Sequence, residues 1–221
     1  MKFEHYNVER TGGPVALDGA WDGPSWGPVP PLHLARHMGD VPAHRPYVRA
    51  KLLYDEDHVH VIFRVEDRYV RAVQEHQGAV CRDSCVEFFF TPGTNPTAGY
   101  FNLETNCGGS MLFHHQTEPR GDHVEIARGD CDRIARLHSL PETVDPEITD
   151  PVTWVLQYRL PLDILAHHSE VVRPAPGAVW RANFYKCADS TSHPHWLTWS
   201  PVERPRPDFH VPECFGRLVF G

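Results

Sequence analysis

Long apolar runs and an excess of positive charge are both missing from this sequence of 221 residues. No stretch approaches the ~20 apolar residues of a membrane span, and the first residues lack the basic and apolar regions of a signal peptide. We therefore expect no membrane partner and a cytoplasmic location. The chain has 29 Asp and Glu against 21 Lys and Arg, which gives a net charge of -8. Because nucleic-acid binding needs a positive field that replaces counterions, we expect no nucleic-acid partner.

Motifs of several enzyme and metal-binding classes are also absent. The chain has no P-loop, dinucleotide fingerprint, nucleophile elbow or HExxH motif. It has six cysteines, and none forms a CxxC pair. We expect them to be reduced and buried rather than bridged. They are Cys81, Cys85, Cys107, Cys131, Cys187 and Cys214.

Strand signals dominate the chain, and helix signals are scarce. Tyr47–Tyr54 and His58–Glu66 flank a polar turn and predict a hairpin, and alternate residues of the second segment are apolar. The only predicted helix is short, Leu162–His168, and follows Pro161. About ten short strands separated by Gly, Pro and Asp clusters predict an all-β fold. We expect an antiparallel β-sandwich, jelly-roll-like, with residues 1–221 as a single domain.

Two predicted strands carry polar side chains among apolar ones. Glu87 interrupts the apolar run Cys85–Thr91, and Asn102 and Glu104 alternate with apolar residues in Tyr100–Asn106. If the two strands are neighbours, their polar side chains merge into one patch. Such a patch is either the solvated face of a sheet or the floor of a binding site, and both interpretations stay open.

Aromatic side chains gather in Pro-rich segments near the end of the sequence. Trp196, Trp199 and Phe209 lie there beside Asn, Asp, Arg and Glu. An aromatic face offers apolar area while neighbouring polar groups set the orientation of a ligand. This combination is typical of a surface that stacks on a sugar ring.

Several blocks, taken in order, resemble the family 9 carbohydrate-binding modules of the DOMON-like superfamily of β-sandwiches. The likeness extends over nearly the whole chain. The blocks are Leu17–Asp22 with Trp26, Lys51–Asp57 running into Val59–Asp67, Asp83–Phe89, Tyr100–Asn106, Trp154–Pro161, and Trp180–Asn183 with Trp199-Ser200 and Phe209–Leu218.

The resemblance implies a site in which a sugar lies between two aromatic side chains. By position, Glu87 corresponds to the acidic ligand residue, Asn102 to a sugar-contacting polar residue and Phe209 to the final stacking aromatic. Arg206 lies three residues before Phe209 and would bind a ring oxygen or an acidic substituent.

The other stacking aromatic of the family has no counterpart here, because residues 80–82 are Val, Cys and Arg. We expect Trp199 or Trp196 to form that second wall. The resemblance also implies structural calcium, for which the pairs Asp18/Asp22 and Asp55/Asp57 offer oxygen ligands.

These observations predict a non-catalytic protein that binds a mono- or oligosaccharide. One alternative is an intracellular glycan-active enzyme, a hydrolase or lyase, in which Glu87 acts with Glu104 or a histidine. A second alternative is a haem- or metal-binding DOMON-like domain, since the chain has 16 histidines but only three methionines.

Overall fold

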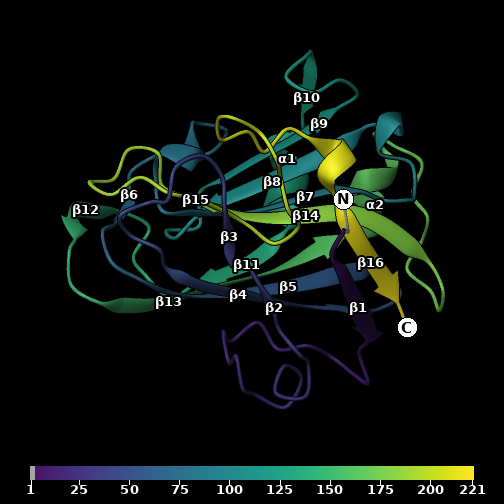
Figure 1. The fold of residues 1–221 in the computed structure, drawn as a ribbon. Coiled ribbons are helices and arrows are strands. Elements are labelled where there is room, and N and C mark those ends of the chain that lie inside the picture. The colour runs from purple at the N-terminus through teal and green to yellow at the C-terminus, as the bar shows by residue number, and fades with distance from the viewer. Residues whose placement is uncertain (1–2) are drawn as a thin grey trace.

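The computed structural model describes residues 3–221, and Figure 1 shows layers of strands that face each other. The first strands are β1 (His5–Arg10), β2 (Leu32–His33), β3 (Arg36–His37), β4 (Tyr47–Tyr54), β5 (His58–Asp67), β6 (Val70–Ala72), β7 (Cys85–Thr91) and β8 (Tyr100–Asn106). The later strands are β9 (Met111–Gln116), β10 (His123–Glu125), β11 (Ala135–His138), β12 (Val144–Ile148), β13 (Val152–Pro161), β14 (Val179–Cys187), β15 (Trp196–Thr198) and β16 (Gly216–Phe220). The α-helices are α1 (Arg128–Arg133) and α2 (Leu162–Ala166).

The prediction of an all-β, sandwich-like fold is confirmed, and its details need correction. The described residues form more strands than the ten we predicted, and a second helix, α1, joins the predicted α2. The higher count comes from short strands, since β2, β3, β6, β10 and β15 have only two or three residues each. Neither helix within residues 3–221 is long and apolar enough to cross a membrane.

One curled sheet supplies both layers. Strands β10-β9-β8-β7-β14-β16 form one part and β4-β5-β13-β11 the other, in that order. β1 joins the two parts, because it pairs in parallel with β16 through residues 5–8 and with β4 through residues 9–10. The expected purely antiparallel arrangement is therefore wrong at β1, where one strand closes an edge of each part.

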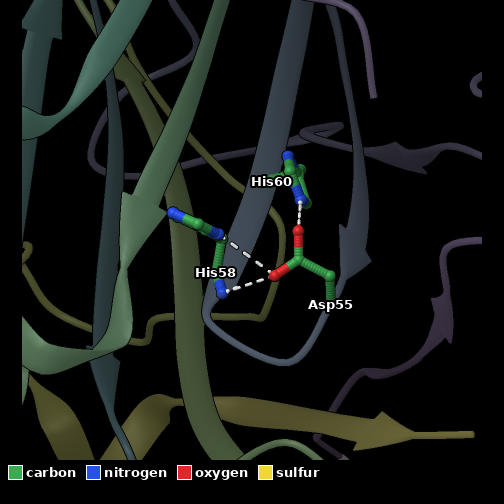
Figure 2. A group of neighbouring side chains, drawn as sticks. All are labelled: Asp55, His58 and His60. Atoms are coloured by element: carbon green, nitrogen blue, oxygen red, sulfur yellow. Dashed lines mark hydrogen bonds and ion pairs between the residues drawn. The ribbon is translucent and has the colours of Figure 1, made fainter. Parts of the chain in front are cut away.

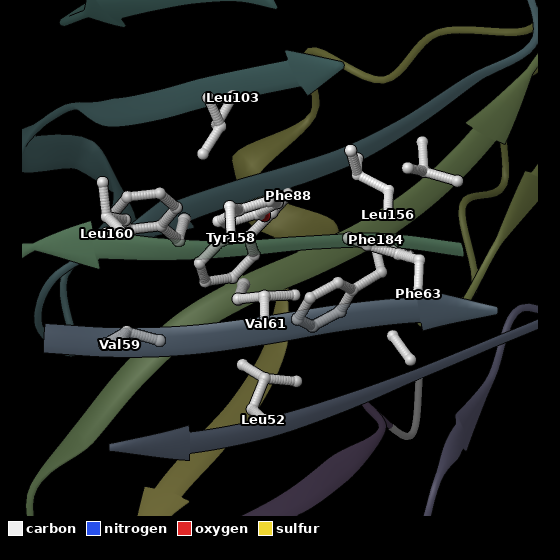
Figure 3. Close-up of a cluster of buried hydrophobic side chains, with 14 of the residues drawn as sticks. Leu52, Val59, Val61, Phe63, Phe88, Leu103, Leu156, Tyr158, Leu160 and Phe184 are labelled. Carbon is white, nitrogen blue, oxygen red and sulfur yellow. The ribbon is translucent and has the colours of Figure 1, made fainter. Parts of the chain in front are cut away.

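The main core lies between the two layers. On β5, Val59, Val61, Phe63 and Val65 all point inward and are fully buried, as their alternation predicted. Phe63 meets Phe184 of β14, with ring centroids 6.1 Å apart, and Figure 3 shows these side chains among their neighbours. Each such aromatic contributes about 1.5–3 kcal/mol through burial.

The outer face of β7, β8 and β14 is covered as well. Phe89, Tyr100 and Tyr185 point away from the main core and pack against Val211 and Phe215 of the C-terminal segment. This cover explains why every residue of β7 and of β8 is buried. A sheet that is buried on both faces can hold polar side chains in a dry environment, which positions the site described below.

Gly216 marks a tight contact between β16 and the main core. A Cβ atom there would lie 2.7 Å from the ring of Trp199 and 2.8 Å from the carbonyl oxygen of Glu4. We expect Gly216→Ala to lower the free energy of unfolding by about 1–3 kcal/mol, because a buried ring and a backbone atom have to shift. Urea denaturation measures this change. Gly129→Ala in α1 is the control, since a Cβ there meets nothing within 4 Å, and an equal loss in both variants would contradict the prediction.

Candidate functional site

A pocket of about 180 Å³ lies on the outer face of the sheet, beneath the C-terminal segment. Strands β7, β8 and β14 form its floor, and β15 and the loop at residues 207–210 form its walls. Drug-sized ligands occupy pockets of ~300–1,000 Å³. The space here therefore suits a smaller ligand or one end of a longer one.

Two carboxyl groups form the floor of the pocket. Glu87 on β7 and Glu104 on β8 are directly opposite each other in the antiparallel pairing, so the predicted polar rows do merge. Both are buried, with 1% and 7% of their surface exposed. Burial and the neighbouring carboxyl raise the pKa of Glu87 well above its ordinary value. Burial also raises the pKa of Glu104 to about 7.

The hydrogen bonds of these carboxyl groups are incomplete. Oε1 of Glu87 accepts a hydrogen bond from the thiol of Cys187 at 3.0 Å. Oε2 of Glu87 is buried and has no hydrogen-bond partner among the described residues. An unpaired buried oxygen costs about 1–3 kcal/mol, which a ligand hydroxyl would offset.

Asn102 lies behind the pocket rather than in its lining. Its Nδ2 donates to Oε1 of Glu104 at 3.0 Å, and its Oδ1 accepts from Nε2 of Gln116 at 2.9 Å. With 1% of its surface exposed, Asn102 is expected to position Glu104. Gln116 is a polar partner that the sequence interpretation missed.

Two aromatic side chains line the pocket walls. The ring of Phe209 stacks on Tyr185 with centroids 4.1 Å apart and planes 7° apart. One face of the phenyl ring is therefore occupied. Trp196 is oriented by a hydrogen bond from its indole Nε1 to Oδ1 of Asp189, at 2.7 Å. Glu87, Phe209 and Trp196 thus meet in one pocket, although they come from three distant parts of the sequence.

Trp199 does not belong to the pocket, and this corrects our expectation. Its ring lies in the main core against Phe184, with centroids 5.7 Å apart, and 6% of its surface is exposed. The physical reason is strand alternation. Leu197 and Trp199 are two residues apart and point inward together, so Trp196 has to point outward.

Arg206 is exposed and does not line the pocket, which is a second correction. The cation in the lining is Arg120 from the loop between β9 and β10. Its guanidinium donates two hydrogen bonds to Oδ1 of Asp208, at 2.8 and 3.2 Å. The path of a loop cannot be predicted from sequence periodicity, so no signal in the sequence singled out Arg120.

His210 also reaches the pocket. Its Nδ1 lies 2.8 Å from the hydroxyl of Tyr100. Burial, together with the charge of Arg120, lowers the pKa of His210 to about 4. The imidazole is therefore neutral at physiological pH, and it can donate or accept a hydrogen bond without carrying charge.

The polar turn between β4 and β5 does not fit the calcium site that the resemblance implied. Figure 2 shows that the carboxylate of Asp55 is held by two imidazoles, at 3.1 Å for Nδ1 of His58 and 2.8 Å for Nε2 of His60. Asp57 is exposed, and its Oδ1 lies 4.0 Å from a guanidinium nitrogen of Arg173. Calcium prefers cages of six to eight oxygens, whereas this cluster has one carboxylate and two nitrogen ligands.

The carboxylate of Asp55 stabilises this turn through hydrogen bonds. Burial raises its pKa, but hydrogen bonds from His60, the amide of Asp57 and His58 outweigh that effect and lower the pKa to about 2. In the other acidic pair, Oδ1 of Asp18 accepts the amide of Ala20 at 3.0 Å. Asp55 and Asp18 therefore each have hydrogen-bond partners within the protein.

Neither methionine within the described residues is free to serve as the axial ligand that the haem alternative needs. Met38 and Met111 are packed in hydrophobic clusters and are 2% and 0% exposed. Met1 lies outside the described residues.

The fold and the pocket together define a β-sandwich module with a small site of carboxyl groups and aromatic side chains. Residues 38–220 match the family described as carbohydrate-binding family 9, and the chain belongs to this family. No curated protein matches the chain significantly.

Solved structures share this fold. The chain is similar to a candidate carbohydrate-binding protein from Bacteroides uniformis, at 26% identity over 100% of both chains and a TM-score of 0.88. It is also similar to a family 9 carbohydrate-binding module from Caldicellulosiruptor kristjanssonii. The complex of that module with glucose has 14% identity and a TM-score of 0.64 and covers 99% of this chain and 96% of that one. The complex with cellotriose has 14% identity and a TM-score of 0.63 and covers 98% of this chain and 93% of that one.

Proposed function

We propose that this chain binds one sugar ring, either a monosaccharide or the end of an oligosaccharide, in the pocket above Glu87. The observation that carries the proposal is the meeting of Glu87, Phe209 and Trp196 in one small hollow of a family 9 fold. A sugar ring has apolar faces for the aromatic walls and hydroxyls for the carboxyl floor.

Each side chain then has a separate role. The phenyl ring of Phe209 offers its face that is not stacked on Tyr185. The unpaired Oε2 of Glu87 accepts a hydrogen bond from a sugar hydroxyl. Because burial raises the pKa of Glu87, the carboxyl group can also be protonated and donate a hydrogen bond to the sugar. Arg120 lines the same pocket and would take the role that we first gave to Arg206. We expect a dissociation constant in the micromolar to millimolar range, which corresponds to a binding free energy of about −4 to −8 kcal/mol.

Calorimetry with glucose, cello-oligosaccharides and xylo-oligosaccharides tests this proposal. We expect Phe209→Ala and Glu87→Ala each to weaken binding of the saccharide that binds by tenfold or more, because about 1.4 kcal/mol corresponds to tenfold. Tyr47→Ala is the matched control, since Tyr47 is an aromatic that is 48% exposed on β4 and does not line the pocket. Unchanged affinity in both pocket variants would rule the site out.

Glycan hydrolysis is the second candidate function, and the carboxyl pair favours it. Glycosidases use one carboxyl group with a raised pKa as an acid, and Glu87 and Glu104 both have raised pKa values. Here, however, they lie on adjacent strands of one floor rather than on either side of a cleft. Hydrolysis of any saccharide in a panel by the wild type, and loss of that hydrolysis in Glu87→Gln, would establish this activity.

A further inference from the structure

Two thiols and a carboxyl group form a buried cluster beside the pocket, and Glu87 and Cys187 of this cluster line the pocket. Cys85 and Glu87 lie two residues apart on β7 and share a face, and Cys187 on β14 is the direct partner of Cys85 in the pairing. The ligand atoms of these three residues lie within 4.8 Å of one another. The thiol of Cys187 contacts Oε1 of Glu87 at 3.0 Å. All three side chains are 0–1% exposed.

The carboxyl groups around this cluster have no basic partner among the described residues. Glu87, Glu104 and Asp189 all line the pocket, and no described Lys or Arg forms an ion pair with any of them. Arg120 is held by Asp208. Lys186 points to the opposite face of β14 and pairs with Asp67. The inner pocket therefore has several carboxyl groups, and no ion pair within residues 3–221 involves them.

Oε1 of Glu87 contacts the thiol of Cys187, and the other carboxylate oxygen is unpaired among the described residues. Oε2 of Glu87 is buried without a hydrogen-bond partner, whereas buried carboxylate oxygens are normally paired. A bound cation satisfies such an oxygen and offsets the charge of the ligands that ionise around it. This observation is independent of the spacing of the thiols, and it points to a ligand at this carboxyl group.

We propose that Cys85, Cys187 and Glu87 bind a zinc ion, with its fourth coordination position directed into the pocket. Thiolates select zinc over calcium and magnesium, which prefer oxygen ligands. Two thiolates and one carboxylate around Zn²⁺ leave a charge of −1. Three protein ligands with one open position define a site that can hold water or an exchangeable ligand.

The metal replaces protons when it binds. Each thiol loses its proton to become a ligand, and Glu87 loses its own where it is protonated, so the released protons go to the buffer. Zinc affinity should therefore fall steeply as the pH falls. The oxidation states do not change, so no oxidant or reductant is needed.

Titration of the reduced full-length chain with Zn²⁺ and Co²⁺, in the absence of sugar, tests the inference. We expect one equivalent of each metal to bind, and Co²⁺ to show a sulfur-to-metal charge-transfer band in the near ultraviolet. Cys187→Ser should weaken zinc binding at least tenfold and reduce the band. Cys131→Ser is the matched control, because Cys131 is a buried cysteine of α1 outside the pocket, and it should bind like the wild type.

A second variant separates loss of the site from loss of the fold. Glu87→Gln keeps both thiols, so we expect it to retain the charge-transfer band while zinc affinity drops at least tenfold. Circular dichroism checks that each variant is folded. No charge-transfer band in the wild type, or equal zinc affinity in Cys187→Ser and Cys131→Ser, would overturn the proposal. Because no sugar is present, failure here would leave the proposed carbohydrate binding untouched.

Discussion

Lys186→Met is expected to lower the free energy of unfolding by about 3–5 kcal/mol at pH 7, since removing one member of a buried ion pair leaves an uncompensated charge. Nζ of Lys186 lies 3.5 Å from Oδ2 of Asp67, and both side chains are fully buried inside the sandwich. Methionine fills a similar volume, so the loss reports the charge rather than a cavity. For a chain of this length the midpoint temperature should drop by roughly 6–20 °C.

The other contacts of Lys186 explain why this side chain tolerates burial. Its ammonium donates to the carbonyl of Cys187 at 2.9 Å and to Nε2 of His195 at 2.7 Å. Because an ammonium has no acceptor, Nε2 of His195 has to accept, and Nδ1 donates to the carbonyl of His193 at 3.0 Å. Burial and the charge of Lys186 lower the pKa of His195 to about 3, so this imidazole is neutral.

Acid should reduce the difference between Lys186→Met and the wild type. Burial raises the pKa of Asp67, but the charge of Lys186 and a hydrogen bond from His44 outweigh burial and lower it to about 2. A depressed pKa stabilises the fold above the ordinary value of 3.8, and this stabilisation is lost as the pH falls through about 2. Urea denaturation at pH 7 and near pH 3 measures both quantities.

Arg128→Met is the control for Lys186→Met. It removes an ion pair with Asp132 in which both side chains are more than half exposed, at 65% and 53%. Exposed pairs contribute about 0.2–1 kcal/mol. A similar loss in the two variants would mean that the interior ion pair has no special role.

Most of the correct predictions from the sequence came from the alternation of inward and outward side chains along strands. The inward side of β5 and the shared face of Cys85, Glu87 and Phe89 both follow from a period of two, and the structure confirms them. The same rule separates Trp196 from Trp199, because three residues along a strand lead to opposite faces. Applied to that short segment, alternation allows only one of the two indoles to face the pocket.

Partners that come from distant loops could not be predicted. Arg120 and Asp189 reach the pocket from loops whose paths depend on tertiary packing. The pairing of Lys186 with Asp67 joins the two layers through charges that composition alone would place in solvent. The thiol cluster likewise depends on the register of β14 against β7, which brings Cys187 opposite Cys85. Binding of a sugar by Glu87, Phe209 and Trp196 stays a prediction.

Glu104→Gln is expected to stabilise the protein at alkaline pH and to have little effect near pH 4. Burial raises the pKa of Glu104 from 4.5 to about 7. A raised pKa stabilises the fold below the ordinary value of 4.5, and this stabilisation is lost as the pH rises through about 7. Glutamine keeps the acceptor for Asn102 Nδ2 but never ionises. The advantage of the variant at pH 8 should reach about 3 kcal/mol.

The measurement is urea denaturation of the wild type and of Glu104→Gln between pH 4 and pH 8, in the presence of a chelator. Without the chelator, a cation bound near Glu87 would itself neutralise the pocket and hide the effect of Glu104. Glu170→Gln is the control, since Glu170 is an exposed carboxyl on a loop, and its stability should follow that of the wild type at every pH. If the difference between Glu104→Gln and the wild type stays constant with pH, then Glu104 ionises normally, and the dry floor that both proposals use does not exist in solution.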